Sequence, residues 1–433
     1  MLSRRREIVT PLFEYPRAVA VNIAALAFST VLPLLACGTP ATEARKVHTG
    51  PTELLHETTA ASADLPAPGP TVGAERLDRL LPLLRGKRVG LVVNHTSLSA
   101  DTHLVDRLLA HDVDVRAVFA PEHGFRGLAS DGERVDDQTD PATGLPIVSL
   151  YGKQKRPTAE HYADLDVVVF DVQDVGTRFY TYIYTMYYAM DAAAEYGVEV
   201  VVLDRPNPLG ALVDGPVLDT AYRSFVGLLP LPSVHGMTVG ELARMYNGEG
   251  WLGDGRNAAL TVVPVANYAV GDEYVLPVRP SPNLPNQASI YLYPTLCHFE
   301  GTVASIGRGT DFPFQVVGHP RFTPDTFAFT PEARPGARYA KLKGEICYGI
   351  DLRDASAATG FAGIDWGLLA TVQRALPDDV DLIARDHFDL VAGGAGLRRA
   401  VENGELSRFG ETYRDEVAAF RERRSPYLLY PRR

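Results

Sequence analysis

Apolar and polar positions follow two different periods from about residue 74 onward. Nearly continuous apolar runs predict strands buried on both faces, at 88–94, 115–120, 146–152, 165–173 and 198–205. Helices are predicted at 102–110, 179–197 and 238–250. The last of these begins with a capping box, because Glu241 stands three residues after Thr238. This alternation predicts an α/β fold, a Rossmann-like and mostly parallel sheet with helices on both faces, over residues 74–285.

The pattern becomes less regular from about residue 286. A helix is predicted at 364–376, and glycine and proline are frequent in this part. We therefore expect a smaller C-terminal α/β auxiliary domain over residues 286–433.

The first residues have the order of a targeting segment. Four arginines precede a mostly apolar run at 18–36, and Cys37 follows a Leu-Leu-Ala sequence. This predicts a lipoprotein signal peptide (1–36), lipidation of Cys37, and a flexible tether (37–73) rich in Ala, Thr, Pro and Gly. The alternative is an uncleaved membrane anchor, which the interruptions of the apolar run disfavour. We expect a lipoprotein of the cell envelope, anchored to a membrane at the periplasmic face or the cell surface.

Charge and cysteine content narrow the function. The net charge of −11 argues against nucleic-acid binding, which requires a basic surface. After Cys37 only Cys297 and Cys347 remain, so a metal site built from cysteines is not expected. Whether these two form a disulfide is left open, because the sequence does not place them near each other. The oligomeric state is left open too.

Polar residues collect where the predicted strands end. Since parallel strands present their carboxyl ends at one edge, these residues should share one rim of the sheet, where such folds bind ligands. Any single one could instead cap a helix or make a turn. The residues are Asn94, His95, Thr96 and Ser97, then Glu122 with His123, the group Asp171, Asp174, Arg178, Tyr180 and Tyr182, and the group Asp204, Arg205 and Asn207.

Two chemistries could use this rim, and two others lack their sequence motifs. A glycosidase needs a protonated carboxyl group beside the leaving oxygen, and Glu122, between Phe119 and Phe125, is the candidate. A metallohydrolase could use histidines 95, 123 and 235 with aspartates 171 and 174, but no close ligand spacing supports it. The glycine-rich turn of a dinucleotide site and the Gly-x-Ser-x-Gly motif of serine hydrolases are both missing from the sequence.

Several long blocks of the sequence resemble one family. "GLVVNHTS", "FAPEHGFRG", "VVVFDVQDVGTRFYTYIYTMYYAM", "VVLDRPNPLG", "PSPNLP" and "EGTVASIGRGT" are similar to the NamZ/YbbC-type exo-β-N-acetylmuramidases. The resemblance covers about residues 74 to 433. It implies a Rossmann-like catalytic domain with an auxiliary domain, no cofactor, and removal of N-acetylmuramic acid from the non-reducing ends of peptidoglycan fragments. It also implies that Glu122, in the Pro-Glu-His-Gly motif, is the catalytic glutamate.

The remaining site residues are hypotheses of our own. His123 or His235 could orient the acid or bind the substrate, and Asp171 or Asp174 could stabilise positive charge on the sugar or activate water. Arg178 and Arg308 are candidates for binding the lactyl carboxylate of muramic acid. The other residues predicted to bind substrate are Asn94, Tyr180, Asp204, Arg205, Asn207 and Glu300. The alternatives to an exo-muramidase are a non-catalytic peptidoglycan-binding lipoprotein and a metal-dependent hydrolase.

Overall fold

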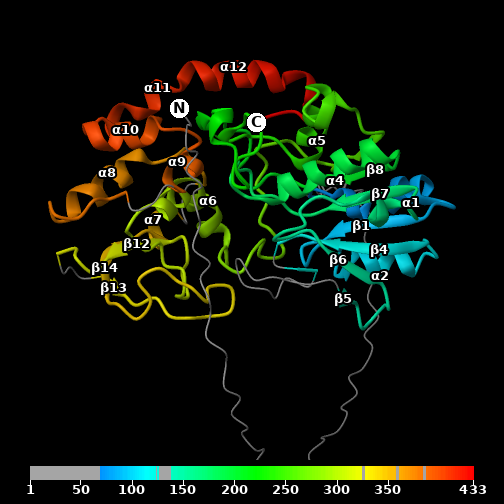
Figure 1. Cartoon of the computed structure of the whole chain (residues 1–433), viewed down its shortest axis with the longest axis horizontal. Coiled ribbons are helices and arrows are strands. Elements are labelled where there is room, and N and C mark those ends of the chain that lie inside the picture. Colours follow the sequence, from blue (N-terminus) through cyan, green and yellow to red (C-terminus); the bar gives the residue numbers. More distant parts are fainter. Residues whose placement is uncertain (1–68, 123, 126–137, 324–326, 357–359, 384–386) are drawn as a thin grey trace, which may run out of the picture. The chain divides into compact units, whose positions relative to one another are not determined.

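A seven-stranded sheet is the centre of the fold (Figure 1). In spatial order its strands are β11 (Leu260–Val263), β8 (Glu199–Leu203), β7 (Val167–Asp171), β1 (Val89–Val93), β4 (Val115–Ala120), β6 (Pro146–Ser149) and β5 (Gln138–Thr139). All neighbours pair in parallel except β5 and β6, which are antiparallel. The predicted mostly parallel sheet is therefore confirmed.

The structure is a computed structural model, and it describes residues 69–433 apart from residue 123 and the segments 126–137, 324–326, 357–359 and 384–386. The predicted signal peptide, Cys37 and most of the predicted tether lie outside the described residues, and so does His123. The end of the predicted tether packs on the fold, since Thr71 and Ala266 exchange two backbone hydrogen bonds of 2.9 and 2.8 Å and Val72 is buried. Thr71 and Val72, which the sequence assigned to the tether, are therefore part of the folded chain.

The strand order changes direction between β1 and β7. From β1 the chain moves outward to β4 and β6, then crosses to β7 on the other side and continues to β8 and β11. In a doubly wound sheet such a reversal opens a crevice at the carboxyl ends of the strands. Asn94, Glu122, Asp171 and Asp204 lie at or just beyond the carboxyl ends of β1, β4, β7 and β8, so they share one edge as predicted.

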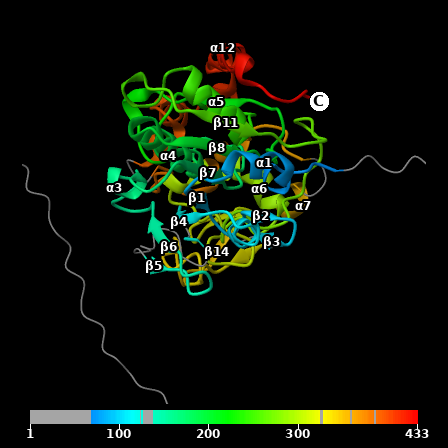
Figure 2. The ribbon, with the colours of Figure 1, turned by 90° about the vertical axis from the view of Figure 1, so that its right-hand side faces the viewer.

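Alternate side chains of the central strands enter two different cores. Val89, Leu91 and Val93 pack in a core with α1 (Leu77–Leu84) and α2 (Leu104–Leu109). Val92, between them, belongs to the larger core that includes α3 (Ala159–Tyr162), α4 (Tyr182–Tyr196) and α5 (Val239–Gly248). Figure 2 shows α4 and α1 on opposite sides of the strands. Helices on both faces are therefore confirmed, and they explain why the strands are apolar throughout.

The helix ends follow the local sequence. The capping box of α5 forms, with the Glu241 N–H donating to Thr238 Oγ1 at 3.3 Å and the Thr238 N–H donating to Glu241 Oε2 at 3.1 Å. Two predicted helices begin later than expected. Residues 102–103 form strand β3 (Thr102–His103), which pairs with β2 (Leu98–Ser99), and α2 starts only after His103. Residues 179–181 precede α4 rather than belong to it.

The C-terminal domain carries a three-stranded antiparallel sheet and several helices. Its strands, in spatial order, are β12 (Val316–His319), β14 (Cys347–Asp351) and β13 (Ala328–Phe329). Its helices are α6 (Gln287–Leu296), the 3-10 helix η4 (Cys297–Gly301), α7 (Arg353–Ser356), α8 (Trp366–Ala375), α9 (His387–Ala392), α10 (Gly396–Asn403), α11 (Phe409–Thr412) and α12 (Arg414–Arg424). Cys297 and Cys347 are both buried free thiols, which answers the question that the sequence left open.

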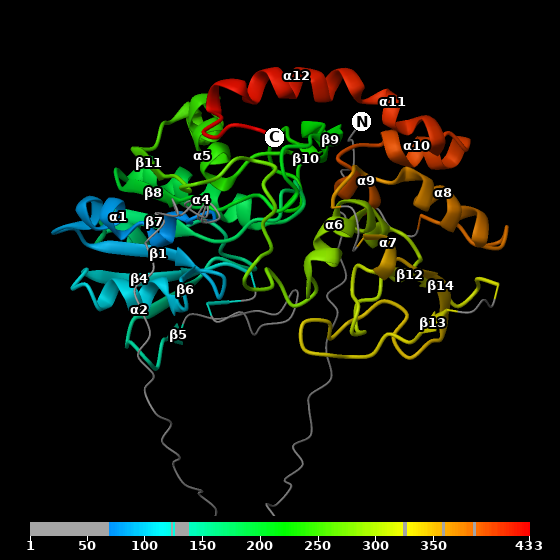
Figure 3. The same cartoon turned by 180° about the vertical axis from the view of Figure 1, so that it is seen from behind.

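The end of the chain returns to the first domain. Helix α12 contacts β9 (Asp214–Val217), which pairs with β10 (Pro232–Val234). Figure 3 shows α12 running back toward α5. Beyond it, the Tyr430 hydroxyl donates to Asp204 Oδ2 at 2.5 Å. None of the described helices combines the length and the apolar character that a bilayer crossing requires.

Candidate active site

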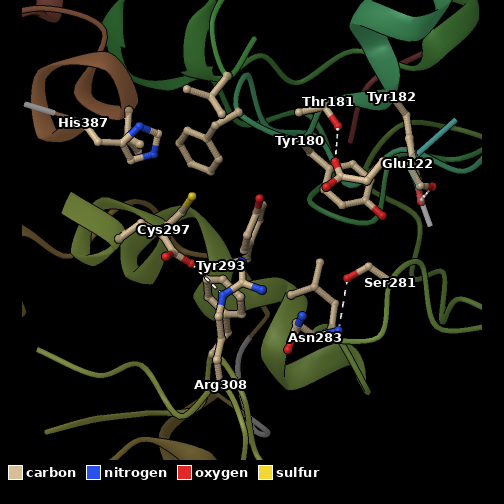
Figure 4. A pocket seen from close by; sticks show the side chains of 16 residues that line it. Glu122, Tyr180, Thr181, Tyr182, Ser281, Asn283, Tyr293, Cys297, Arg308 and His387 are labelled. Atoms are coloured by element: carbon tan, nitrogen blue, oxygen red, sulfur yellow. Dashed lines mark hydrogen bonds and ion pairs between the residues drawn. The ribbon is translucent and has the colours of Figure 1, made fainter. Parts of the chain in front are cut away.

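A cavity of about 230 Å³ lies at the carboxyl side of the sheet, where it meets α6, η4 and α9 (Figure 4). Four of the residues predicted for the site line it, namely Glu122, Tyr180, Glu300 and Arg308. The other lining residues are Phe179, Thr181, Tyr182, Val226, Ser281, Asn283, Leu284, Tyr293, Cys297, Phe314, His387 and Val391. Residues far apart in sequence thus form one site.

Glu122 enters the cavity from the loop that follows β4. Pro121 ends the strand, and the Gly124 N–H donates to the Pro121 carbonyl at 3.0 Å with φ of +73°, a conformation that favours glycine. The Thr181 hydroxyl donates to Glu122 Oε2 at 3.1 Å, and the Tyr182 hydroxyl donates to the Glu122 carbonyl at 3.3 Å. The start of α4 therefore holds both the side chain and the backbone of Glu122.

Aromatic rings form a continuous wall of the cavity. Tyr180 lies 4.9 Å from Tyr182 and 6.0 Å from Tyr293 between ring centroids, and Tyr293 lies 4.9 Å from Phe314. Burial raises the pKa of Tyr180 and of Tyr293 well above that of a free phenol, so both stay neutral. The Tyr180 hydroxyl donates to the Pro280 carbonyl at 2.8 Å, which leaves a fixed, uncharged aromatic surface.

A charged pair forms another part of the wall. Arg308 Nε donates to Glu300 Oε1 at 2.7 Å, and the guanidinium lies 4.9 Å from the centroid of Phe314. Burial acts to raise the pKa of Glu300, but the charges of Arg308 and Lys341 outweigh it, and the pKa lies below the usual value. Glu300 is therefore ionised, and its contact with Nε and the Phe314 ring orient the guanidinium.

Eight residues predicted for the site do not reach the cavity lining that the described residues form. They are Asn94, Asp171, Asp174, Arg178, Asp204, Arg205, Asn207 and His235. All are buried, and the structure gives them partners within the fold.

Asp171 and Arg205 bind each other. Arg205 Nε donates to Asp171 Oδ1 at 2.6 Å and Nη2 donates to Oδ2 at 2.9 Å, with 3% of the arginine side chain and none of the aspartate exposed. Nη2 also donates to the Leu98 carbonyl at 2.9 Å. This bidentate pair joins the ends of β7 and β8 and leaves neither group facing the cavity.

Asp174 and His235 form a second internal pair. Asp174 Oδ2 accepts from the Gly176 N–H at 2.7 Å and lies 3.4 Å from His235 Nε2. His235 Nδ1 accepts from the Met237 N–H at 3.2 Å. These contacts fix the turns after β7 and β10, which explains why both residues are buried.

Asp204, Asn94 and Asn207 organise loops after the strands. Asp204 accepts from the Thr238 hydroxyl and the Gly240 N–H, each at 2.7 Å, so it ties β8 to the start of α5. Asn94 Oδ1 accepts from Thr96, and Asn207 Oδ1 accepts from the Leu209 N–H at 3.0 Å. These are turn contacts of the ordinary Asx kind.

Arg178 is fully buried behind the cavity wall. Its Nη2 donates to the Val391 carbonyl at 3.0 Å, and no carboxylate pairs with it among the described residues. Desolvation lowers the pKa of the guanidinium. Arg178 thus anchors α9, whose Val391 faces the cavity, and it is Arg308 that presents a guanidinium to the cavity itself.

Several lining residues were not predicted. Tyr182 belongs to the predicted strand-end group and does line the cavity, whereas Thr181, Ser281, Asn283 and His387 were not predicted. The Asn283 N–H donates to Ser281 Oγ at 3.3 Å, which shapes the loop before α6. The quoted family-like blocks contain Thr181, Ser281 and Asn283 and were thus a signal for these three, while His387 has no local signal.

The described residues hold no group of three or more His, Cys, Asp and Glu side chains arranged as metal ligands. Cys297 faces the cavity, but burial raises the pKa of its thiol far above the usual value, so it stays protonated. Besides the tyrosines and Cys297, the described lining contains the ionisable side chains of Glu122, Glu300, Arg308 and His387, on which acid–base chemistry and carboxylate binding in this cavity would depend.

The fold and the cavity define a doubly wound α/β protein whose site is completed by a C-terminal domain. Residues 89–288 match the family model described as Exo-beta-N-acetylmuramidase NamZ, N-terminal, and residues 291–430 match the corresponding C-terminal model. The chain belongs to the NamZ exo-β-N-acetylmuramidase family and is thus a glycoside hydrolase.

Individual relatives agree. The chain is 40% identical over 382 residues to the peptidoglycan β-N-acetylmuramidase NamZ of Bacillus subtilis strain 168, covering 82% of this chain and 90% of the relative. The crystal structure of a DUF1343 family protein from Bacteroides fragilis NCTC 9343 is 41% identical, with a TM-score of 0.76 over 84% of this chain and 100% of the other. A second such structure from the same organism is 32% identical, with a TM-score of 0.71 over 83% and 99%.

Proposed function

We propose that the protein releases single N-acetylmuramic acid residues from the non-reducing ends of peptidoglycan fragments, with Glu122 as the general acid. The observation that carries this proposal is the position of Glu122, which lines the cavity and accepts a hydrogen bond from Thr181 on one carboxyl oxygen. The other oxygen is then available to protonate the oxygen of a leaving sugar.

The size of the cavity supports exo action. Its volume of about 230 Å³ lies below the range of about 300–1,000 Å³ that is typical of sites for larger ligands. A cavity of this size suits one substituted sugar ring, which an enzyme that trims chain ends must hold. The relative from Bacillus subtilis is named a peptidoglycan β-N-acetylmuramidase, which fits a muramic acid in this position.

Arg308 supports recognition of muramic acid over its parent sugar. Among the described residues that line the cavity, it is the one lysine or arginine, and Glu300 and Phe314 orient it. A guanidinium binds carboxylates with paired hydrogen bonds, and the lactyl group is the carboxylate that distinguishes muramic acid from glucosamine. We propose that Arg308 contacts this group.

The decisive experiment compares two leaving groups. The soluble chain from residue 38, its Glu122→Gln variant and an exposed control, Glu160→Gln, are assayed on a disaccharide with N-acetylmuramic acid at its non-reducing end and on para-nitrophenyl N-acetylmuramide. On the disaccharide, Glu122→Gln should lose roughly a hundredfold or more of kcat/KM. The loss should be much smaller on the nitrophenyl sugar, since nitrophenolate leaves without protonation.

Other outcomes would separate the alternatives. Equal losses on both substrates would argue against a general acid and for another role of Glu122. A wild-type chain that binds the sugar without cleaving it would support a non-catalytic binding protein, and activity that disappears on chelation would support a metal-dependent hydrolase. Release of N-acetylglucosamine from the matching glucosaminide would contradict the assignment of Arg308.

We further propose that the chain is attached to a membrane of the cell envelope through a lipid on Cys37. The sequence around Cys37 supports this. In cells, the full chain should fractionate with membranes and incorporate labelled fatty acid, and Cys37→Ser should abolish the labelling. Labelling that persists in this variant would contradict the proposal.

A further inference from the structure

The Lys341 side chain binds the backbone of a turn in the C-terminal domain, residues 299–304. Its ammonium nitrogen lies within hydrogen-bond distance of four backbone carbonyl oxygens, those of Phe299 at 3.0 Å, Glu300 at 3.3 Å, Thr302 at 2.7 Å and Ala304 at 3.0 Å. The Phe299 carbonyl also accepts from the Thr302 N–H at 3.0 Å, while Thr302 and Ala304 lie just beyond η4, which ends at Gly301. Lys341 places a positive charge where these four carbonyls converge, from a segment about forty residues further along the chain.

This turn carries one wall of the cavity. Glu300 is one of the four residues whose carbonyls Lys341 binds, and its side chain accepts from Arg308 Nε at 2.7 Å. Glu300 and Arg308 both line the cavity. The contacts therefore run from Lys341 through the backbone at 299–304 to Glu300, and from Glu300 to the Arg308 guanidinium.

Removal of the ammonium would loosen this chain of contacts. Four carbonyl oxygens converge on one point, and their partial negative charges repel each other when no cation lies between them. The turn would then relax, and Glu300 would move with it. The Arg308 guanidinium would then lose one of the contacts that orient it, although the sheet, Glu122 and Thr181 would stay as they are.

We propose that Lys341 is a positioning residue that sets the preference for an acidic sugar, by holding the turn 299–304 so that Glu300 presents Arg308 to the carboxylate of the substrate. This inference rests on the proposed function, in which Arg308 binds the lactyl carboxylate. The preference for an acidic sugar would then depend on Lys341, whose side chain does not line the cavity.

The test compares an acidic substrate with its neutral counterpart. The wild type, Lys341→Met and the control Lys343→Met, which alters an exposed lysine two residues away, are assayed on the disaccharide ending in N-acetylmuramic acid and on the same disaccharide with the lactyl group as an amide. In Lys341→Met, the ratio of kcat/KM for acid over amide should fall about tenfold, mostly through KM for the acid. Arg308→Gln should lower the same ratio, and Lys341→Met should not lower it further in the Arg308→Gln background.

Two results would overturn the inference. One is an unchanged ratio in Lys341→Met, including the case where activity on both substrates falls together with stability. The other is a Lys341→Met effect that adds in full to that of Arg308→Gln. If Lys341→Met does not fold, Lys341→Gln, which keeps N–H donors but not the charge, is used with the same expected fall.

Failure of the proposed function gives a different result. If the wild type cleaves neither disaccharide, the proposed activity is wrong, and free N-acetylmuramic acid and its amide are then titrated against wild type and Lys341→Met. Weaker binding of the acid alone in the variant would still support the role of Lys341, and equal binding would refute it.

Discussion

The Thr181 hydroxyl donates a hydrogen bond of 3.1 Å to Glu122 Oε2, although the two residues come from loops after different strands. This bond fixes one carboxyl oxygen and thereby directs the other. Thr181→Val should lower kcat/KM on the muramyl disaccharide about fivefold to tenfold, since one such bond contributes about 1 kcal/mol. Thr181→Ser keeps the hydroxyl and should stay within about twofold of wild type. A Thr181→Val enzyme as fast as wild type would show that the bond does not matter for catalysis.

Much of the sheet could be predicted from the sequence, because its central strands are buried on both faces and therefore apolar throughout. Strand β4 was predicted with its observed bounds, 115–120. The hairpin at 98–103 could not be predicted, because Thr102 and His103 directly precede the apolar spacing of α2 and were included in the predicted helix. Short hairpins have too few residues to establish a period of their own.

The site was predicted only in part, for a physical reason. The strand-end pattern correctly placed Glu122 at the cavity, but polar residues at the ends of adjacent strands also bind each other, as Asp171 and Arg205 do. Part of the lining comes from residues of the C-terminal domain more than a hundred positions away, such as Tyr293 and His387. Only packing of the C-terminal domain brings them to the sheet, and no local pattern encodes that packing.

The Asp171–Arg205 pair should matter for stability. Removing one partner of a buried ion pair leaves an uncompensated charge and lowers the free energy of unfolding by about 3–5 kcal/mol. Asp171→Ala should therefore unfold at a much lower denaturant concentration than wild type. Asp171→Leu combined with Arg205→Met should be less destabilised than Asp171→Ala, because neither charge then remains. Glu199→Gln, which breaks an exposed pair with Lys87, should cost less than about 1 kcal/mol.

An Asp171→Asn variant with the stability of wild type and a large loss of kcat would make Asp171 a catalytic candidate again. Urea unfolding followed by tryptophan fluorescence, beside the disaccharide assay, distinguishes the two cases.

Gly393 packs against the guanidinium of Arg178. A Cβ atom at Gly393 would lie 2.6 Å from Arg178 Nη2, and the residue has φ of +83°. Gly393→Ala should therefore destabilise the protein by at least about 2 kcal/mol, from backbone strain and overpacking together. Gly404 has a similar φ of +71° with no atom within 4 Å, so Gly404→Ala isolates the strain alone, about 1 kcal/mol. Equal unfolding free energies for the two variants would refute the packing argument.

Asp204 should make stability depend on pH. Burial raises its pKa to about 7 from an ordinary value of 3.8, despite hydrogen bonds from Tyr430, Thr238 and Gly240 that act to lower it. Between these two values the folded state binds more protons at this site than the unfolded state does, so the slope of unfolding free energy against pH is negative. The contribution of Asp204 is thus fully present below about pH 4 and is lost as the pH rises through about 7.

The measurement is the difference in unfolding free energy between wild type and Asp204→Asn, taken by urea denaturation from pH 4 to pH 8. Asparagine does not ionise, so this difference isolates the proton bound by Asp204 from the titration of all other groups. Wild type should lose stability relative to the variant between about pH 4 and pH 7, and the difference should become constant above that range. The exposed Asp378→Asn should show no such trend. If wild type instead gains stability over the variant as the pH rises, the Asp204 carboxylate is stabilised in the folded state, and its contacts with Thr238 and Gly240 outweigh its burial.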